Sequence, residues 1–123
     1  SGADLYGANL REANLSWANL SEANLAGADL RWANLRGANL SGANLREADL
    51  READLTNTVV KGADMQNADL RGADLYGADL EDAKLEGAKY TTVEGTLSLN
   101  MEHMPTIWPE GFDPEAAGCH LVD

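Results

Sequence analysis

The hydrophobic and polar residues of this chain follow a repeating unit of five: alanine, then aspartate or asparagine, then leucine, then two variable positions. The pattern runs in one register from Ala3 to Tyr90, with alanine first in 17 of 18 units and leucine third in 15 of 18. The exceptions are Thr58 in a first position and Val60, Met65 and Tyr90 in third positions. Such regular spacing predicts that every unit buries its leucine.

A period of five fits neither an α-helix nor a flat strand. Five residues advance a helix by about 140°, which spreads the leucines around the whole cylinder. In a strand, an odd repeat sends successive leucines to opposite faces. A coil that turns a corner every five residues does bury them, because each short side then points its central leucine at one axis. Stacked coils would share backbone hydrogen bonds at about 4.8 Å per layer.

The arginines favour four sides for each coil, because one set of them recurs every twenty residues: Arg11, Arg31, Arg51 and Arg71. Arg36 and Arg46 depart from this spacing. Four sides would place a second outward column beside the arginines: Asn9, Asp29, Asp49 and Asp69. We interpret the two columns as a charge lattice between neighbouring coils, in preference to a recognition face for an acidic partner.

The repeat closely resembles the consensus A(D/N)LXX of the pentapeptide-repeat family, over residues 3–90. That family forms a right-handed quadrilateral β-helix, so the resemblance implies an all-β solenoid. Eighteen units at four per coil would give about four and a half coils, a rod about 22 Å long, with a non-repeat C-terminal cap. In the one broken unit, Thr58-Val59-Val60, we expect local strain or a small bulge.

The composition changes after residue 90, which divides the chain into a pentapeptide-repeat β-helix, 1–90, and a C-terminal tail, 91–123. The segment 106–118, with its WPEGFDP motif, resembles a tail that follows the repeats in many cyanobacterial members of the family. A repeat array needs a cover at each end. We therefore expect the tail to cap the last coil through its apolar residues: Ile107, Trp108 and Phe112.

The net charge of −12 is unevenly placed, because residues 91–123 carry six acidic groups and no lysine or arginine. This balance argues against nucleic acid as a partner, which needs an excess of basic residues. No apolar run approaches the length of a membrane span and no signal peptide is visible, so we expect no membrane partner. The chain begins at Ser1 without methionine, which favours a removed upstream segment and leaves the compartment open, with the cytoplasm favoured.

The residues give no sign of a catalytic, cofactor-binding or metal site. Cys119 and His120 are sequence neighbours, which does not orient a nucleophile against a base. The sequence has no Gly-rich phosphate loop, no cysteine pair and no metal-ligand cluster. Stacked carboxylates such as Asp54 and Asp74 would suit a hard cation, but asparagines elsewhere in that column argue against one. We expect neither an enzyme nor a cofactor.

Outward aromatic and basic side chains are the candidates for contact with a partner. Those that we single out are Trp17, Trp32, Tyr76, Arg31 and Arg51. Exposed tryptophan on a rigid surface is typical of a binding hot spot. The alternative is that single exposed aromatic residues have no function.

We predict a non-enzymatic scaffold that binds an unidentified protein, as a monomer or a weak end-to-end dimer. The alternative is a DNA-mimicking modulator of DNA gyrase, a role known in one branch of the family. Members of that branch are typically longer, often carry phenylalanine at the central position and dimerise through a C-terminal element. Here phenylalanine is absent from the repeats and arginines interrupt the acidic surface, which favours the scaffold.

Overall fold

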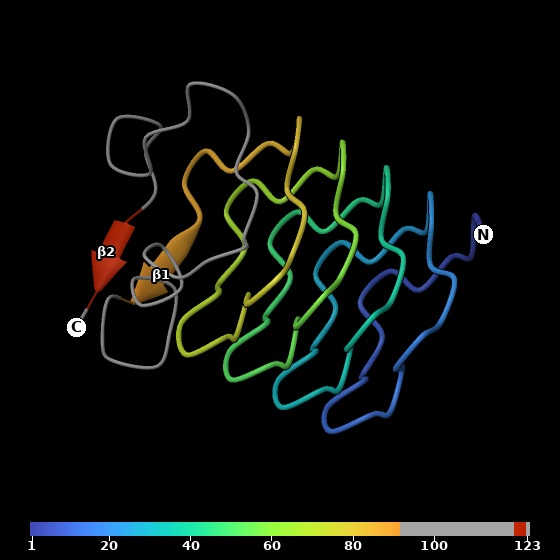
Figure 1. The fold of residues 1–123 in the computed structure, drawn as a ribbon. Coiled ribbons are helices and arrows are strands. Elements are labelled where there is room, and N and C mark those ends of the chain that lie inside the picture. The colour runs from blue at the N-terminus through green and yellow to red at the C-terminus, as the bar shows by residue number, and fades with distance from the viewer. Residues whose placement is uncertain (92–119, 123) are drawn as a thin grey trace.

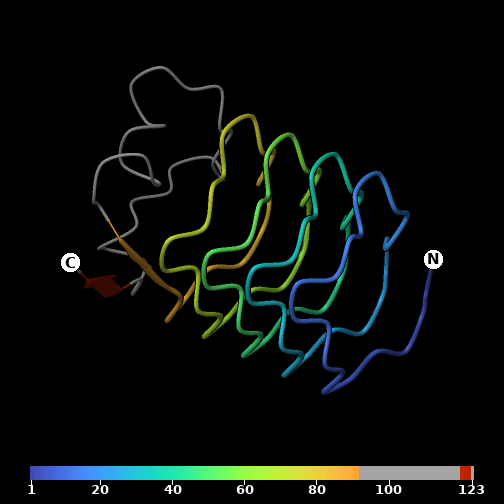
Figure 2. The ribbon, with the colours of Figure 1, turned by 90° about the horizontal axis from the view of Figure 1, so that it is seen from below.

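The computed structural model of the chain describes residues 1–91 and 120–122. Figure 1 and Figure 2 show residues 1–91 wound into a stack of coils, with the N-terminus at one end and β1 at the other. Fourteen isolated parallel bridges join the second residues of units twenty positions apart, from Asp4–Asn24 to Asp69–Lys89. One turn of the coil therefore takes four units, which confirms the four-sided solenoid.

Each corner of the coil is a tight turn closed by a backbone hydrogen bond. The first residue of a unit donates its N–H to the central residue three positions earlier, as Ala8 does to Leu5 at 3.0 Å. The third residue of the turn is the fifth of its unit, and it has positive φ at all eighteen corners from Gly2 to Gly87. Positive φ at this position alone is the signature of a type II turn.

Backbone hydrogen bonds join each side of a coil to the next coil. The N–H of Leu25 donates to the carbonyl of Asn44 at 2.7 Å, and the N–H of Gly27 donates to Arg46 at 2.9 Å. Asn44 donates back to Ala23 at 2.9 Å. The Oδ1 of Asn44 also accepts the N–H of Arg46 at 3.1 Å. The aspartate or asparagine of the repeat therefore satisfies a turn amide locally, as short polar side chains at turns do.

First- and third-position side chains fill the interior of the coil. The leucines from Leu25 to Leu55 are at most 1% exposed, and the alanines beside them are equally buried. Burial of one leucine side chain contributes about 1.5–3 kcal/mol, so the leucine stack is the main source of stability. In the first coil the central leucines are only partly buried: Leu5, Leu10 and Leu15.

The unit that begins at Thr58 does not form the bulge that its sequence predicts. Val59 pairs in register with the coils on both sides. Thr58 is larger than the usual alanine, but Val60 is smaller than the usual leucine, so the buried volume is nearly conserved and the core accepts the exchange. The hydroxyl of Thr58 donates to the carbonyl of Leu55 at 2.8 Å, which satisfies the buried polar group.

Two short strands lie at the C-terminal end, β1 (Lys89–Thr91) and β2 (His120–Val122). They pair in parallel, with Lys89 opposite His120. Strand β2 therefore continues the backbone ladder that joins Asp69 to Lys89 on the preceding coil. The residues predicted to cap the last coil lie outside the described residues: Ile107, Trp108 and Phe112.

Leu40→Asp tests the inward assignment of the central position. Leu40 is 1% exposed, so the variant would bury an unpaired carboxylate, which costs several kcal/mol and should abolish cooperative folding. Ser41→Asp changes the adjacent outward residue and should leave the melting temperature nearly unchanged. Thermal melts followed by circular dichroism compare the two variants. Unchanged melting of Leu40→Asp would show that this position does not face the core.

Candidate functional site

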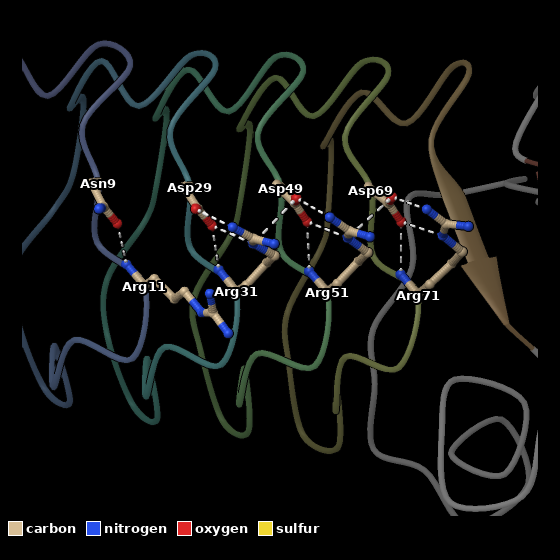
Figure 3. Close-up of polar contacts among 8 residues, drawn as sticks. All are labelled: Asn9, Arg11, Asp29, Arg31, Asp49, Arg51, Asp69 and Arg71. Carbon is tan, nitrogen blue, oxygen red and sulfur yellow. Dashed lines mark hydrogen bonds and ion pairs between the residues drawn. The ribbon is translucent and has the colours of Figure 1, made fainter.

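One side of the coil carries the arginine column and is called here the arginine face: the units that begin at Ala8, Ala28, Ala48, Ala68 and Ala88. On this face Arg31 pairs with Asp29 of its own unit, through Nε at 2.9 Å from Oδ1 and a terminal nitrogen at 2.7 Å from Oδ2. The Nε of Arg31 also lies 3.7 Å from Oδ2 of Asp49 on the next coil. Figure 3 shows how this arginine joins two carboxylates along the column.

The arrangement repeats on the following coils. Arg51 pairs with Asp49 at 2.9 and 2.7 Å, and its Nε lies 3.7 Å from Oδ2 of Asp69. Arg71 makes the last bidentate pair, with Asp69 at 2.9 and 2.6 Å. The charge lattice predicted from the twenty-residue spacing is therefore present over three coils.

The arginine face as a whole carries no net charge, because its units contain five acidic and five basic residues in a chain of net charge −12. Arg11 stands outside the lattice, since Asn9 replaces the aspartate and only the backbone N–H of Arg11 contacts it, at 3.2 Å. Arg31 and Arg51, two of the predicted contact residues, are held in ion pairs within the chain. Exposed pairs of this kind add little stability individually.

The lattice shifts the pKa values of its members. The Arg31 side chain lowers the pKa of Asp29 to about 2, chiefly by hydrogen bonding and against an opposing effect of burial. Arg51 lowers the pKa of Asp49 in the same way, and Asp49 raises the pKa of Arg51. These aspartates are therefore ionised throughout the neutral range.

The adjacent side of the coil, called here the tryptophan face, consists of the units that begin at Ala13, Ala33, Ala53 and Ala73. The structure brings three of the predicted contact residues to this face or its edge. Trp17 and Tyr76 belong to its units, and Trp32 is the corner residue that precedes the unit of Ala33. Trp17, Trp32 and Tyr76 are 72%, 56% and 46% exposed. Tyr6 is also exposed but lies on a different side.

Both tryptophans occupy corner positions with positive φ, 64° at Trp17 and 62° at Trp32. This backbone conformation costs about 1–2 kcal/mol for a residue with a side chain, whereas glycine adopts it freely. Nine of the eighteen corners are glycine. Neither the turn nor the core therefore requires tryptophan at these two corners.

The indole ring of Trp17 lies against Gly37, the corresponding corner of the next coil. A Cβ atom added at Gly37 would collide with carbon atoms of the ring. Gly37 therefore leaves room for the ring, and glycine also adopts the φ of 69° without strain. The five-residue pattern alone does not predict this contact, although a tryptophan followed by glycine twenty positions later is a readable signal.

Arg36, which departs from the twenty-residue spacing of the arginine column, is a further functional candidate. It is exposed, and its unit has Asn34 in place of aspartate. The Oδ1 of Asn34 accepts the backbone N–H of Arg36 at 3.0 Å. Within residues 1–91 and 120–122, Arg36 forms no ion pair, whereas Arg46 reaches Asp64 at 3.2 Å. Asn44 precedes Arg46 in the same way, so the sequence alone does not single out Arg36.

The described part of the chain contains no group of three or more histidine, cysteine, aspartate or glutamate residues placed to hold a metal ion. In that same part, no helix has the length and apolar character needed to cross a bilayer. The coil interior is packed with leucine and alanine. The chemistry available to these residues is therefore that of the outward side chains.

A protein-family model described as pentapeptide repeats matches the chain in eight copies, over residues 1–37, 23–62, 33–72 and 53–89. The match covers nearly all of the repeat region seen in the structure. A search of curated proteins finds no match.

Several solved structures are similar. One is HetL, a pentapeptide repeat protein involved in heterocyst differentiation regulation from the cyanobacterium Nostoc sp. strain PCC 7120. It is 43% identical in sequence with a TM-score of 0.71, and the match covers 74% of this chain and 42% of HetL. A pentapeptide repeat protein of the Arabidopsis thaliana thylakoid lumen is 34% identical, with a TM-score of 0.75, over 83% of this chain and 71% of that protein. A further Nostoc pentapeptide repeat protein is 39% identical, with a TM-score of 0.59, over 97% and 84%. This chain thus spans less than half of HetL.

Asp29→Asn tests the lattice through its pH dependence. Folding lowers the pKa of Asp29 to about 2, so its pair stabilises the protein above about pH 4 and loses that effect as the pH falls toward 2. The variant should melt below wild type at neutral pH, and the two should converge in acid. Asp74→Asn is the matched control, because Tyr76 stands where arginine would be. An equal loss in both variants at neutral pH would contradict a specific contribution from Arg31.

Trp17→Gly and Trp32→Gly test whether the tryptophans serve stability. Substitution by glycine removes about 1–2 kcal/mol of backbone strain at the turn. This gain exceeds the cost of the larger conformational entropy of glycine in the unfolded chain, about 0.5–1 kcal/mol. The melting temperatures should therefore stay the same or rise. Trp17→Ala and Trp32→Ala keep the Cβ atom and should melt below the glycine variants. A glycine variant that melts well below its alanine counterpart would show that the turn is unstrained.

Proposed function

This chain belongs to the pentapeptide-repeat family, and on that basis we propose that it is a non-enzymatic scaffold that binds another protein through its outward side chains. Proteins of this family fold as right-handed quadrilateral β-helices and are generally structural scaffolds. The observation that carries the proposal is the exposure of Trp17 and Trp32 on a rigid surface whose folding does not require them. Tryptophan is among the residues most enriched at binding hot spots.

The scaffold proposal extends to the dimensions and ends of the molecule. Eighteen units correspond to a rod of about four and a half coils, about 22 Å long. We assign residues 1–90 to the rod and 91–123 to a capping tail, and the pairing of β2 with β1 supports the return of the tail to the last coil. The capping side chains would be those that the sequence suggests: Ile107, Trp108 and Phe112.

The proposed partner is a protein and neither nucleic acid nor a membrane, since lysine and arginine number nine against 21 acidic residues. We propose that the chain itself is a monomer or a weak end-to-end dimer. The described core residues face only one another, so a partner meets a surface whose backbone is already ordered. Such order reduces the entropy lost on binding.

A DNA-mimicking modulator of DNA gyrase is the second candidate. It is favoured by the distribution of charge, because residues 1–45 carry a net charge of −1 and residues 46–91 carry −5. However, the three carboxylates best aligned along the rod are paired with arginines: Asp29, Asp49 and Asp69. A rod of about 22 Å also spans only about six base pairs of duplex. These features favour the scaffold.

A photo-crosslinking scan tests the scaffold proposal. The fourth residues of four consecutive units sample all four sides of the coil at one level of the rod: Arg36, Ser41, Arg46 and Arg51. Each is replaced in turn by benzoyl-phenylalanine, and the proteins are irradiated in an extract of the source organism. We expect a discrete protein adduct from at least one side, suppressed by excess unlabelled wild-type protein. The absence of a suppressible adduct on every side would contradict the scaffold.

A supercoiling assay with purified DNA gyrase separates the second candidate from the first. Titration with the chain should leave supercoiling unchanged if the scaffold proposal is correct. Inhibition at sub-micromolar protein that is relieved by Asp74→Asn and Asp79→Asn would instead support DNA mimicry. Asp29→Asn is a poor choice for that purpose, because the charge of Asp29 is already compensated by Arg31.

A further inference from the structure

We propose that the N-terminal half of the tryptophan face binds an extended, acidic peptide segment of the partner protein. This surface, called here the tryptophan patch, consists of six residues: Asn14, Ser16, Trp17, Trp32, Asn34 and Arg36. The proposal rests on the scaffold function and adds to it the binding surface and the chemistry of the partner.

The two tryptophans lie at the two ends of one side of a coil, the side formed by the unit that begins at Ala33. Trp32 is the corner before the unit of Ala33, and Trp17 lies against Gly37, the corner that ends this unit. Gly37 is five positions after Trp32, so the two corners are at most about 18 Å apart. An extended peptide of about six residues spans that distance.

The ring of Trp17 is already positioned for binding. It is 72% exposed, yet one side of it rests on the backbone of Gly37. A fixed aromatic ring loses little conformational entropy when a partner covers it. Positive φ is shared by seven other corners with side chains, so what distinguishes Trp17 and Trp32 is the large exposed ring and not the backbone conformation.

The polar groups of the tryptophan patch are mainly hydrogen-bond donors. The Oδ1 of Asn14 accepts both the N–H and the hydroxyl of Ser16, at 3.1 and 2.7 Å. The Oδ1 of Asn34 accepts the N–H of Arg36. The side-chain NH₂ groups of both asparagines donate to no residue within 1–91 and 120–122, and are left to face a ligand. The backbone carbonyls of an extended peptide supply acceptors of this kind.

Arg36 selects an acidic ligand over a neutral or basic one. The nearest aligned carboxylate on the next coil, Asp54, accepts the N–H and the hydroxyl of Thr56 and forms no ion pair with Arg36. A carboxylate of the partner would complete a charge-assisted, bidentate pair with the guanidinium. The tryptophan patch contains no acidic residue, whereas residues 46–91 carry a net charge of −5, so an acidic segment is favoured at this patch over the C-terminal half of the rod. A neutral oligosaccharide would leave Arg36 without a counter-charge.

Selection from a random peptide library displayed on phage, with the whole chain immobilised, tests the proposal. We expect enriched peptides to combine aspartate or glutamate with aromatic or aliphatic residues. The affinity of a selected peptide should fall at least about tenfold in Trp32→Gly and in Arg36→Gln. Two control variants should keep the affinity: Glu47→Gly, at a corner of the same positive φ on another side, and Arg46→Gln. The melting temperature of each variant is measured in parallel.

Three results would overturn the proposal: enrichment of basic peptides, equal binding by Trp32→Gly and wild type, or no enrichment. The same variants are also tested for binding to an array of neutral oligosaccharides. Binding to an oligosaccharide that is lost in Trp32→Gly but kept in Arg36→Gln would show that the ligand is a glycan and not an acidic peptide. The crosslinking scan separates this proposal from the scaffold itself. Because benzoyl-phenylalanine at residue 36 removes Arg36 itself, Ser16 carries the crosslinker for the tryptophan face in this comparison. A protein adduct at residue 46 or 51 without one at residue 16 would leave the scaffold standing and refute the tryptophan patch.

Discussion

The structure depends on the hydrogen bond that each central residue from Leu5 to Leu70 donates to the carbonyl nineteen positions ahead, as Leu25 does to Asn44 at 2.7 Å. This offset stacks every unit on the fourth unit after it. The leucines then form a continuous buried column, and any outward residue gains neighbours twenty positions before and after it. The hydrophobic interior and the lattice of Asp29 and Arg31 are therefore two results of one backbone register.

Much of this architecture can be read from the sequence because a period of five permits few ways to bury Leu40 and its equivalents. The twenty-residue spacing of the arginines also predicted the lattice of the arginine face. Three features needed coordinates. The fit of Thr58 depends on the smaller volume of Val60, the ring of Trp17 rests on Gly37, and Arg36 lacks an ion-pair partner among the described residues. Each depends on two positions at once, which a repeat pattern read one position at a time does not reveal.

The outward surface contains two kinds of charged residue. On the arginine face, Arg31, Arg51 and Arg71 are bound by carboxylates of the same chain, so their charges are compensated within the chain. Arg36 has asparagine in place of the aspartate of its own unit, and among the described residues it forms no ion pair with the next coil either. Arg46 also follows an asparagine, yet it reaches Asp64 on the next coil. Whether an arginine is compensated therefore depends on residues of two coils and not on its own unit alone.

The twenty-residue turn also fixes the side of the coil on which each outward residue lies. Loss of a single unit, such as 58–62, would keep every leucine inward but turn all later units by one side. Tyr76 would then leave the tryptophan face for the arginine face, although the core would be unchanged. Loss or gain of four units together preserves every column. Loss or gain of a single unit therefore rearranges the outward columns while the fold continues, and only changes by whole turns preserve them.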